Sequence, residues 1–326
     1  MIVCVSVNPA IDKRCRIDDL LIGGVNRIRS VNSFAGGKAA HVAMAAKALG
    51  EEVAWIGFLG GETGRAIELE LIELGIEVVP VRTLAATRTN LEVIDDSGRI
   101  TEILEPGGTI SQDELEQFRS VCDETFGKAG DKSVVVLSGS LSPGVPVNEY
   151  AVLAESARKH GAMVILDASG IALEAALAAS PDLIKPNRSE AEHAAGITIS
   201  TDEDAVKAAD ILRGRGAKAV ALTLGSDGLL LSRNGAPTIF ARQPDVNVVS
   251  TVGCGDAAVA GFATALTRGS LEIDSVRLAA ACGAANCAAK LPGQIERALV
   301  ESLMDEIEVR VASDAAGVSA YKLNQC

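Results

Sequence analysis

Apolar runs of strand length alternate with amphipathic segments of helix length along most of the chain. The runs that predict buried strands each end in Gly, Ser, Asp or Asn, and they are MIVCVSV, VAWIGFLG, SVVVLSG, MVILDAS, PDLIKPN and AVALTLG. Between them, segments such as KAAHVAMAAKALG and SQDELEQFRSVCDETFG repeat apolar residues at helical spacing. This alternation predicts a mostly parallel sheet with helices on both faces, where ligands bind beyond the carboxyl ends of the strands.

Two segments depart from this alternation, residues 13–34 and 86–106. Both have strand-like periodicity and many charges, and the second contains the turn signal Asp96-Ser97-Gly98. They predict an excursion of antiparallel β-strands that projects from the main sheet and serves as a lid over the site, a dimer surface, or both. The expected organisation is therefore an α/β core (1–12, 35–85 and 107–311), a β lid (13–34 and 86–106) and a C-terminal tail without a clear pattern (312–326).

Composition narrows the classes of function. The net charge of −13 argues against a general partner among nucleic acids or anionic membranes. No run reaches the ~18 apolar residues of a membrane span, and the N-terminus resembles a first strand more than a signal peptide. The seven cysteines are scattered without a C-x-x-C pair, which predicts a cytoplasmic protein with reduced thiols. Cys282 and Cys287 have a poor zinc spacing and are expected to pack within helices.

The stretch VGCGDAAVAG places Asp256 behind two glycines at the predicted start of a helix. One interpretation is a cap, in which the carboxylate accepts hydrogen bonds from the first free amides. The other is a general base beside an anion cradle made by the amides of Gly253, Cys254 and Gly255. The residue types alone leave both open.

A second polar motif, IKPNRSEAEHAAG, places Asn187 and Glu190 on the first turn of the next predicted helix. They either punctuate the helix start or organise a hydrated Mg²⁺ and nucleotide phosphates, since Mg²⁺ prefers oxygen ligands and keeps its waters. The stretch LTLGSDG predicts a hairpin and is weak evidence alone. A Walker A loop and a G-x-G-x-x-G turn are both absent from the expected places, which removes P-loop kinases and weakens an NAD-linked oxidoreductase.

The front of the chain supplies further polar groups. Asp12 follows the first predicted strand, either as a turn residue or as a group that holds sugar hydroxyls, and glycines 36 and 37 permit close approach of a ligand. Lys38 opens a helix, where a cation opposes the dipole, so it is expected to face an anion. Arg88, with Arg27 and Arg29, supplies the positive cluster that a sugar phosphate needs, although Arg29 is more simply a solvated charge.

Together these motifs resemble the ribokinase/PfkB family of carbohydrate kinases over residues ~1–310. The carriers are GGK at 36–38, KPN..E at 185–190 and TVG.GD...AGF at 251–262, which fall in the family's order and of which the last is close to its signature. NPAID, TRTN, TEILEPG and LSGSLSPGVP look like the phosphosugar branch. The resemblance implies a ribokinase-like three-layer α/β/α fold whose mostly parallel sheet carries a small β lid.

It also implies roles for individual residues. Asp256 would take the proton from the acceptor hydroxyl while Gly253, Cys254 and Gly255 hold the γ-phosphoryl oxygens. ATP and Mg²⁺ would be the cofactors, with Asn187 and Glu190 near the metal through water and Thr251, Val252 and Gly293 offering carbonyls to a monovalent cation such as K⁺. The remaining nucleotide side would comprise Lys185, Thr223, Gly225, Ser226, Gly228, Gly283 and Asn286. The phosphosugar would be held by Asp12, Gly36, Gly37, Lys38, His41, Arg88, Asn90, Ser138 and Arg27.

The sequence departs from the family in one motif. GGKAAHVA stands where the family usually has G-G-K-G-x-N-V-A, so Ala39 replaces a glycine and His41 replaces an asparagine that contacts sugar hydroxyls. Imidazole is bulkier than an amide and, when neutral, offers one donor and one acceptor. The identity of the sugar is therefore open. Ala257, where serine is common, is a milder change.

The leading hypothesis is an ATP- and Mg²⁺-dependent phosphotransferase that acts on a hydroxymethyl group of a ketohexose phosphate. The family implies a homodimer through the lid. A kinase for an unphosphorylated sugar or a nucleoside is the main alternative. A sugar- or nucleotide-binding sensor without catalysis and an NAD-linked oxidoreductase are the others.

Overall fold

A long twisted sheet forms the centre of the molecule. The computed structural model describes residues 1–270, 272–312 and 319–320. The sheet order is β15-β14-β13-β12-β11-β10-β9-β8-β1-β4-β5, parallel from β11 to β5 and antiparallel from β11 to β15. Its strands are β1 (Ile2–Ser6), β4 (Val53–Leu59), β5 (Glu77–Arg82), β8 (Val134–Ser138), β9 (Met163–Asp167), β10 (Leu183–Ile184), β11 (Ala219–Thr223), β12 (Leu229–Arg233), β13 (Ile239–Arg242), β14 (Glu308–Val311) and β15 (Ser319–Ala320).

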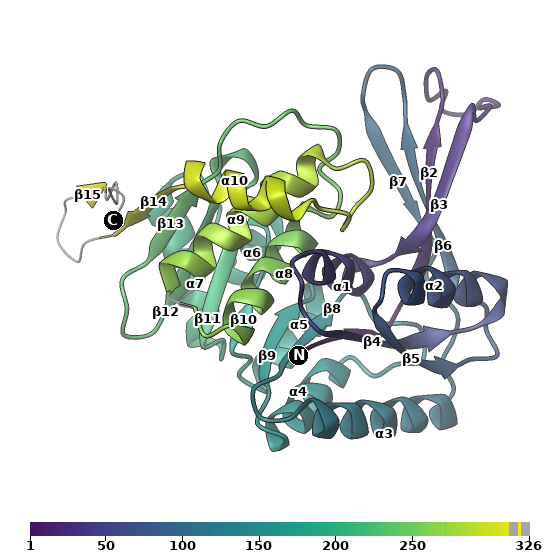
Figure 1. Cartoon of the computed structure of the whole chain (residues 1–326), viewed down its shortest axis with the longest axis horizontal. Helices are drawn as coiled ribbons and strands as arrows, with labels where there is room; N and C mark the ends of the chain where they lie inside the picture. The colour runs from purple at the N-terminus through teal and green to yellow at the C-terminus, as the bar shows by residue number, and fades with distance from the viewer. Residues whose placement is uncertain (271, 313–318, 321–326) are drawn as a thin grey trace.

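Helices cover both faces of this sheet (Figure 1). One layer packs on Ile2, Cys4 and Trp55 and consists of α1 (Lys38–Ala48), α2 (Gly61–Glu73), α8 (Cys254–Thr267), α9 (Glu272–Ala288) and α10 (Arg297–Glu306). The opposite layer packs on Val3, Val5 and Ala54 and consists of α3 (Gln112–Ala129), α4 (Glu149–Lys159), α5 (Gly170–Leu177), α6 (Arg188–Ala195) and α7 (Asp202–Gly214). Alternate residues of one buried strand thus serve two cores, which confirms the predicted three layers.

A second, four-stranded sheet projects from one end of the core (Figure 1). Its order is β3-β2-β6-β7, with β2 (Ala10–Arg16), β3 (Ser30–Gly36), β6 (Arg88–Ile94) and β7 (Ile100–Leu104). The predicted antiparallel pairing is correct for β2 with β3 and for β6 with β7 but wrong for the central pair, because β2 and β6 come from separate excursions of the chain and run parallel. We call it the small sheet. It has a core of its own around Cys15, Ile17 and Val93, and much of β3 and β7 is exposed.

The topology fixes where a ligand can bind. The chain leaves β1 toward β4 and β5 on one side, whereas β8 to β11 extend from the other side of β1. At such a switch point the loops after neighbouring strands diverge and open a crevice at the carboxyl edge of the sheet. The small sheet rises from the same edge, because β2 begins four residues after β1 ends.

Some local predictions need correction. PDLIKPN forms only a two-residue strand, β10, before Pro186 and the start of α6 interrupt it. The tail predicted over 312–326 lies mostly outside the described residues, although 319–320 pair with β14 as the edge strand. Among the described helices, none combines the length and apolar character needed to cross a membrane.

Candidate active site

A cavity of about 1020 Å³ opens at the carboxyl edge of the sheet, between the core and the small sheet. It is lined by most of the residues predicted from the sequence: Asp12, Gly37, Lys38, His41, Arg88, Asn90, Ser138, Lys185, Asn187, Glu190, Thr223, Gly225, Ser226, Gly228, Thr251, Val252, Gly253, Cys254, Gly255, Asp256 and Gly283. Four predicted residues are outside this lining: Arg27, Gly36, Asn286 and Gly293. The fold therefore brings together motifs from both ends of the chain.

The first turn of α8 forms one wall of the cavity. Gly253 is its N-cap residue in the left-handed conformation, with a φ of 81°, and a Cβ there would lie 2.7 Å from Pro292. The N-terminal amides of a helix face outward with partial positive charge, so this turn offers donors to an anion. A Cβ on Gly255 would lie 3.1 Å from Lys185 Nζ, which places that ammonium group beside the same turn.

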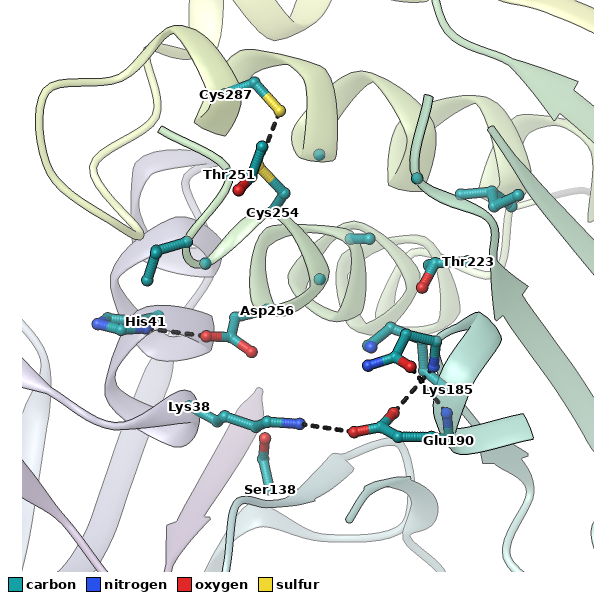
Figure 2. A pocket seen from close by; sticks show the side chains of 18 of the residues that line it. Lys38, His41, Ser138, Lys185, Glu190, Thr223, Thr251, Cys254, Asp256 and Cys287 are labelled. Carbon is teal, nitrogen blue, oxygen red and sulfur yellow. Dashed lines mark hydrogen bonds and ion pairs between the residues drawn. The ribbon is translucent and has the colours of Figure 1, made fainter. Parts of the chain in front are cut away.

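The carboxylate of Asp256 does not cap α8. No side chain caps this helix, and the Asp256 side chain instead turns toward α1, where its Oδ2 lies 2.8 Å from Nδ1 of His41 (Figure 2). The residue is 7% exposed and lines the cavity. Of the two interpretations of this motif, the geometry favours a carboxylate available to a ligand over a helix cap.

His41 joins two carboxylates across the floor of the cavity. Its Nδ1 meets Asp256, and its Nε2 lies 3.4 Å from Oδ2 of Asp12. Burial by itself would lower the pKa of His41, but the two carboxylates raise it to about 10. The ring is therefore an imidazolium at neutral pH, and it offsets part of the negative charge in this half of the cavity.

Asp12 is held from three directions. Besides His41, the amide of Asn90 donates to its Oδ1 at 2.9 Å and the backbone N–H of Gly37 donates to its Oδ2 at 3.2 Å. Burial would raise the pKa of Asp12, but His41, Asn90 and Gly37 hold it below its ordinary value. Gly36 permits this arrangement, because a Cβ there would lie 2.1 Å from the carboxyl carbon of Asp12. Gly36 thus acts on the cavity through Asp12.

A buried carboxylate that was not predicted from the sequence, Asp167 at the end of β9, lies beneath two of the lining lysines. Its Oδ1 lies 3.0 Å from Lys38 Nζ and 3.5 Å from Lys185 Nζ. Burial would raise the pKa of Asp167, whereas the two ammonium groups hold it below its ordinary value. The position of Asp167 at a strand end was the available signal. Its importance depends on two lysines that are distant in sequence.

Lys38 also reaches toward the other half of the cavity. Its Nζ lies 3.9 Å from Oε1 of Glu190 (Figure 2). Burial would lower the pKa of Lys38, but Asp167, Asp256 and Glu190 raise it above its ordinary value. The anions that this helix-opening lysine faces here are carboxylates of the protein.

Asn187 and Glu190 form a reciprocal capping box at the start of α6. Asn187 Oδ1 accepts from the Glu190 N–H and Glu190 Oε2 accepts from the Asn187 N–H, both at 2.9 Å. The helix-punctuation interpretation is thus correct for these atoms. Glu190 Oε1 remains outside the box, and both residues line the cavity. An oxygen donor of this kind suits Mg²⁺ bound through water. Among the described residues, no group of three or more His, Cys, Asp or Glu side chains is arranged to hold a metal ion directly.

Backbone forms the far end of the cavity. Between β11 and β12, residues 225–227 make one 3₁₀ turn, and the predicted hairpin is confirmed. Gly228 has a φ of 94°, and a Cβ there would lie 2.0 Å from the carbonyl oxygen of Ala241, so only glycine fits. The Gln243 amide donates to the Gly225 carbonyl at 2.9 Å, and Gly283 of α9 faces the carbonyl of Cys254.

The basic residues predicted for a sugar phosphate divide into two groups. Arg88 lines the cavity, where its Nη atoms donate to the carbonyls of Glu105 at 2.7 Å and Asn8 at 3.1 Å, while its Nε is buried without a partner. Burial lowers the pKa of Arg88. Arg27 lies exposed in the loop before β3, and Arg29 pairs with Asp18 at 3.0 Å, as expected of a surface charge.

Three further buried polar atoms among the lining residues lack a hydrogen-bond partner: Ser138 Oγ, Asn90 Oδ1 and His41 Nε2, of which the last lies 3.4 Å from Asp12 Oδ2. Buried polar groups in proteins are normally paired. Together with Arg88 Nε they indicate that this part of the cavity suits a ligand with several polar groups.

A buried ion pair that was not predicted from the sequence connects the small sheet to residues 250–255, which we call the anion-hole segment because their amides offer donors to an anion. Arg14 Nε donates to Glu92 Oε2 at 2.8 Å, and the Arg14 guanidinium also donates to the Lys290 carbonyl and to Ser250 Oγ. Arg14 and Glu92 come from β2 and β6, and Ser250 precedes the first turn of α8. Through Arg14, the small sheet therefore contacts the residues that lead directly into that turn.

Asn286 and Gly293 support the anion-hole segment from behind. The Asn286 amide donates to the Val252 carbonyl at 2.8 Å, and its Oδ1 accepts from the Gly293 N–H at 2.8 Å. The Thr251 carbonyl accepts from the Cys254 N–H at 3.3 Å. In this structure Asn286 therefore contacts protein backbone instead of lining the cavity near Gly283.

The prediction that Cys282 and Cys287 pack within helices is confirmed, because both lie in α9. Cys282 is fully buried in α9. Cys287 lines the cavity, and its Sγ lies 2.8 Å from Sγ of Cys254 on α8. A spacing along one helix gave no information about this partner on another.

Comparisons with known proteins decide the family. The model of the pfkB family carbohydrate kinases matches residues 5–296. The chain belongs to the pfkB family of carbohydrate kinases. It is 36% identical to a 1-phosphofructokinase of Rhodobacter capsulatus over 86% of this chain and 88% of that protein, and 31% identical to a tagatose-6-phosphate kinase of Staphylococcus epidermidis over 95% and 99%.

The fold agrees with the sequence relatives. The structure matches phosphofructokinase-2 from Escherichia coli in complex with fructose-6-phosphate with a TM-score of 0.85 and 28% identity, over 94% of this chain and 98% of that one. The predicted resemblance and fold class are thus confirmed. As a pfkB carbohydrate kinase, the chain belongs to a class of ATP-dependent enzymes.

Proposed function

We propose that this protein transfers the γ-phosphoryl group of ATP to a hydroxymethyl group of a ketohexose phosphate. Fructose 1-phosphate, tagatose 6-phosphate and fructose 6-phosphate are the candidate acceptors, in keeping with the names of its relatives. The observation that carries the proposal is the carboxylate of Asp256. It lies between a sugar-facing end with Asp12 and Asn90 and a far end with Glu190 and Gly225, at the first turn of a helix.

In this proposal Asp256 accepts the proton of the attacking hydroxyl. The amides at Gly253, Cys254 and Gly255 donate hydrogen bonds to the oxygens of the phosphoryl group in transfer, and Lys185 adds positive charge beside them. Phosphoryl transfer requires mainly alignment and charge stabilisation, and these groups supply both. Asp12, Asn90 and Ser138 orient the sugar through its hydroxyls.

The Mg²⁺ of the ATP complex would lie toward Glu190 and Asn187, held through water. When bound, it offsets the negative charge of the nucleotide phosphates. Glu190 Oε1, which lies outside the capping box and 3.9 Å from Lys38 Nζ, is the protein oxygen that would orient its waters. A monovalent cation such as K⁺ would use the carbonyls of Thr251 and Val252 near Gly293, in line with the potassium complex described for a structural neighbour.

The phosphate of the sugar would bind toward the small sheet. Arg88 offers its unpartnered Nε there, Lys38 lies on the same side, and Arg27 joins only if the loop before β3 folds over the cavity. We further propose that the small sheet acts as the lid and as the surface of a homodimer. Exposed apolar side chains on and beside its strands support this: Leu21, Ile22, Val25, Ile28, Val31, Ile103 and Leu104. A reduced cytoplasmic setting suits its free thiols.

A kinase for an unphosphorylated sugar is the second candidate. Both Nη groups of Arg88 are already bonded to backbone carbonyls, and Lys38 is already paired with Asp167. If these contacts persist with ligand bound, little positive charge remains for a sugar phosphate.

A coupled assay of ADP release tests the proposal. Purified protein with ATP and Mg²⁺ is offered fructose 1-phosphate, fructose 6-phosphate, tagatose 6-phosphate, fructose, ribose and adenosine. Turnover on a phosphosugar is the expected result. Turnover only on an unphosphorylated compound would support the second candidate. If the protein binds ATP but releases no ADP with any compound of the panel, the result would contradict the kinase proposal and favour a sensor.

A further inference from the structure

Two thiols lie in contact where the anion-hole segment enters α8. Cys254 is the first residue of α8, Cys287 lies in the last turn of α9, and their Sγ atoms are 2.8 Å apart (Figure 2). A disulfide has an S–S length of ~2.05 Å, so the sulfurs need to approach by only about 0.8 Å. Covalent linkage therefore requires little movement of either helix.

These two cysteines differ from the others in access. Six of the seven cysteines lie in the described part of the chain, and among those six Cys254 and Cys287 are half-buried while the other four are buried. Both line the cavity, so a small oxidant in the cavity can reach them. Burial raises the pKa of Cys282 and Cys122, which keeps those thiols protonated and inert.

The contact lets either thiol donate a hydrogen bond to the other. When Cys254 donates, the pKa of Cys287 falls below its ordinary value. In that arrangement Cys287 is the more nucleophilic sulfur and reacts first with an electrophile.

The backbone around the pair is already fastened together. The N–H groups of Val249 and Ser250 donate to the Cys287 carbonyl at 2.7 and 3.2 Å. Asn286 donates to the Val252 carbonyl. The end of α9 therefore holds the segment that leads into α8, and a bond between the thiols would pull on the first turn of α8 itself.

We propose that Cys254 and Cys287 are a site of reversible oxidation, and that a disulfide between them disables the anion-hole turn. The oxidant is a hydroperoxide, with hydrogen peroxide as the simplest example. The bond can form whatever reaction the site catalyses, but its effect on turnover rests on the function proposed above.

The disulfide forms in two steps. The Cys287 sulfur attacks one peroxide oxygen, the O–O bond breaks, and the departing hydroxide takes up a proton and leaves as water. The Cys254 sulfur then attacks the sulfenic sulfur of Cys287, the S–O bond breaks, and hydroxide leaves as water with the Cys254 proton. The two sulfurs lose two electrons and the peroxide gains two. A dithiol reverses the reaction by thiol–disulfide exchange.

The consequence for activity follows from the position of Cys254. Its amide belongs to the turn proposed to hold the transferred phosphoryl group, and Asp256 lies two residues further along the helix. A displacement of about 1 Å at a reacting centre costs ~10²-fold in rate. We therefore expect oxidation to lower the rate of phosphoryl transfer by about 10- to 100-fold.

Peptide mapping tests the bond independently of activity. The intact protein is treated with stepped hydrogen peroxide, alkylated and digested with trypsin without reductant. Cleavage after Arg242, Arg268, Arg277 and Lys290 leaves Cys254 alone in 243–268 and Cys282 with Cys287 in 278–290. Cys282→Ala removes the ambiguity in the second peptide and is also the matched control on the same helix.

The expected result is a 243–268/278–290 cross-link that forms in the wild type and in Cys282→Ala, is absent from Cys287→Ala and Cys287→Ser, and disappears with dithiothreitol. ADP release, compared with each protein's own reduced form, falls with the cross-link and returns with dithiothreitol. Cys287→Ala and Cys287→Ser should lose this sensitivity, and two replacements guard against one that fails to fold.

Absence of the cross-link at peroxide concentrations that oxidise Cys287 to sulfinic acid would overturn the proposal. A cross-link that forms without any loss of turnover would overturn the proposed effect of the disulfide on activity. Equal peroxide sensitivity in the Cys287 variants and the wild type would do the same. If the reduced protein releases no ADP with any acceptor of the panel, the function proposed above fails. The peptide mapping still decides whether the disulfide forms.

Discussion

The two ends of the cavity present different kinds of chemical group to a ligand. At the sugar-facing end, Asp12, His41 and Asp256 form a buried chain of charged side chains that depend on one another. At the far end, Gly225, Gly228 and the capping box of Asn187 and Glu190 present backbone and short polar groups. A binding site made of interacting side chains changes its preferred ligand when one of them is substituted. A site made of backbone groups keeps its geometry through many substitutions. We therefore expect the first end to set the choice of sugar and the second end to bind the nucleotide.

Substitution of Asp12 should separate the two ends most strongly. In Asp12→Asn the sugar-facing end loses a charged acceptor, and hydrogen bonds to charged groups contribute roughly 1.5–3 kcal/mol each. We expect kcat/KM for the sugar to fall by about 10- to 100-fold. Steady-state kinetics with each substrate varied in turn measures this, and the KM for ATP should stay within about twofold of the wild type. An equal rise in both KM values would contradict the division.

A matched pair of glycines sharpens the same comparison. An added Cβ at Gly36 would clash with the Asp12 carboxylate, whereas at Gly225 nothing lies within 4 Å and only the φ of 69° opposes alanine. Gly36→Ala should therefore raise the KM for the sugar by about 10-fold through displacement of one charged hydrogen bond. Gly225→Ala should lower the free energy of unfolding by about 1 kcal/mol and leave the sugar KM unchanged. Kinetics and urea unfolding of both variants provide the check, and a sugar KM unaffected in Gly36→Ala would contradict it.

The charge on His41 predicts a pH dependence of stability. Its pKa rises from an ordinary 6.5 to about 10 on folding, so the ion pairs stabilise the protein fully below pH 6.5. This stabilisation is lost as the pH rises through about 10. The wild type should therefore exceed His41→Asn in unfolding free energy by roughly 1–3 kcal/mol at pH 6 and by less at pH 10. Urea unfolding at both pH values measures it, and a gap that widens with pH would contradict the assignment of an imidazolium.

The smallest effect is expected at the helix cap of the nucleotide end. Asn187→Ala removes the acceptor for the Glu190 N–H and should cost about 1 kcal/mol of stability. Thermal unfolding gives this number, and the KM for ATP·Mg²⁺ shows whether Asn187 also orients the metal. A KM that rises by more than about threefold would add the metal role to the cap, and an unchanged KM would limit Asn187 to capping.

The strands and amphipathic helices of the core were predictable because each leaves a local pattern. α3 has both the helical spacing and the Ser111–Glu114 capping box. α9 was not found from its periodicity, although Cys282 and Cys287 were expected to pack within helices, because it is buried along most of its length and lacks a polar face. Periodicity alone has no signal for such a helix.

The site was predictable where residues lie within one motif and not where they meet through the fold. Gly253 to Asp256 form a contiguous stretch, and the sequence placed them together. The ion pair of Arg14 with Glu92 joins residues that are 78 positions apart, and Cys254 contacts Cys287 across 33 positions. Such contacts depend on how β2 pairs with β6 and how α8 packs on α9, which one sequence does not specify.

The most direct test of the central claim compares Asp256→Asn with the wild type. Single-turnover phosphoryl transfer is measured with saturating ATP·Mg²⁺ and the best acceptor from the panel, and ATP affinity is measured by calorimetry. If Asp256 is the general base, the rate falls by about 10²–10⁴-fold while the affinity for ATP stays nearly constant. A variant that transfers the phosphoryl group as fast as the wild type would contradict the account.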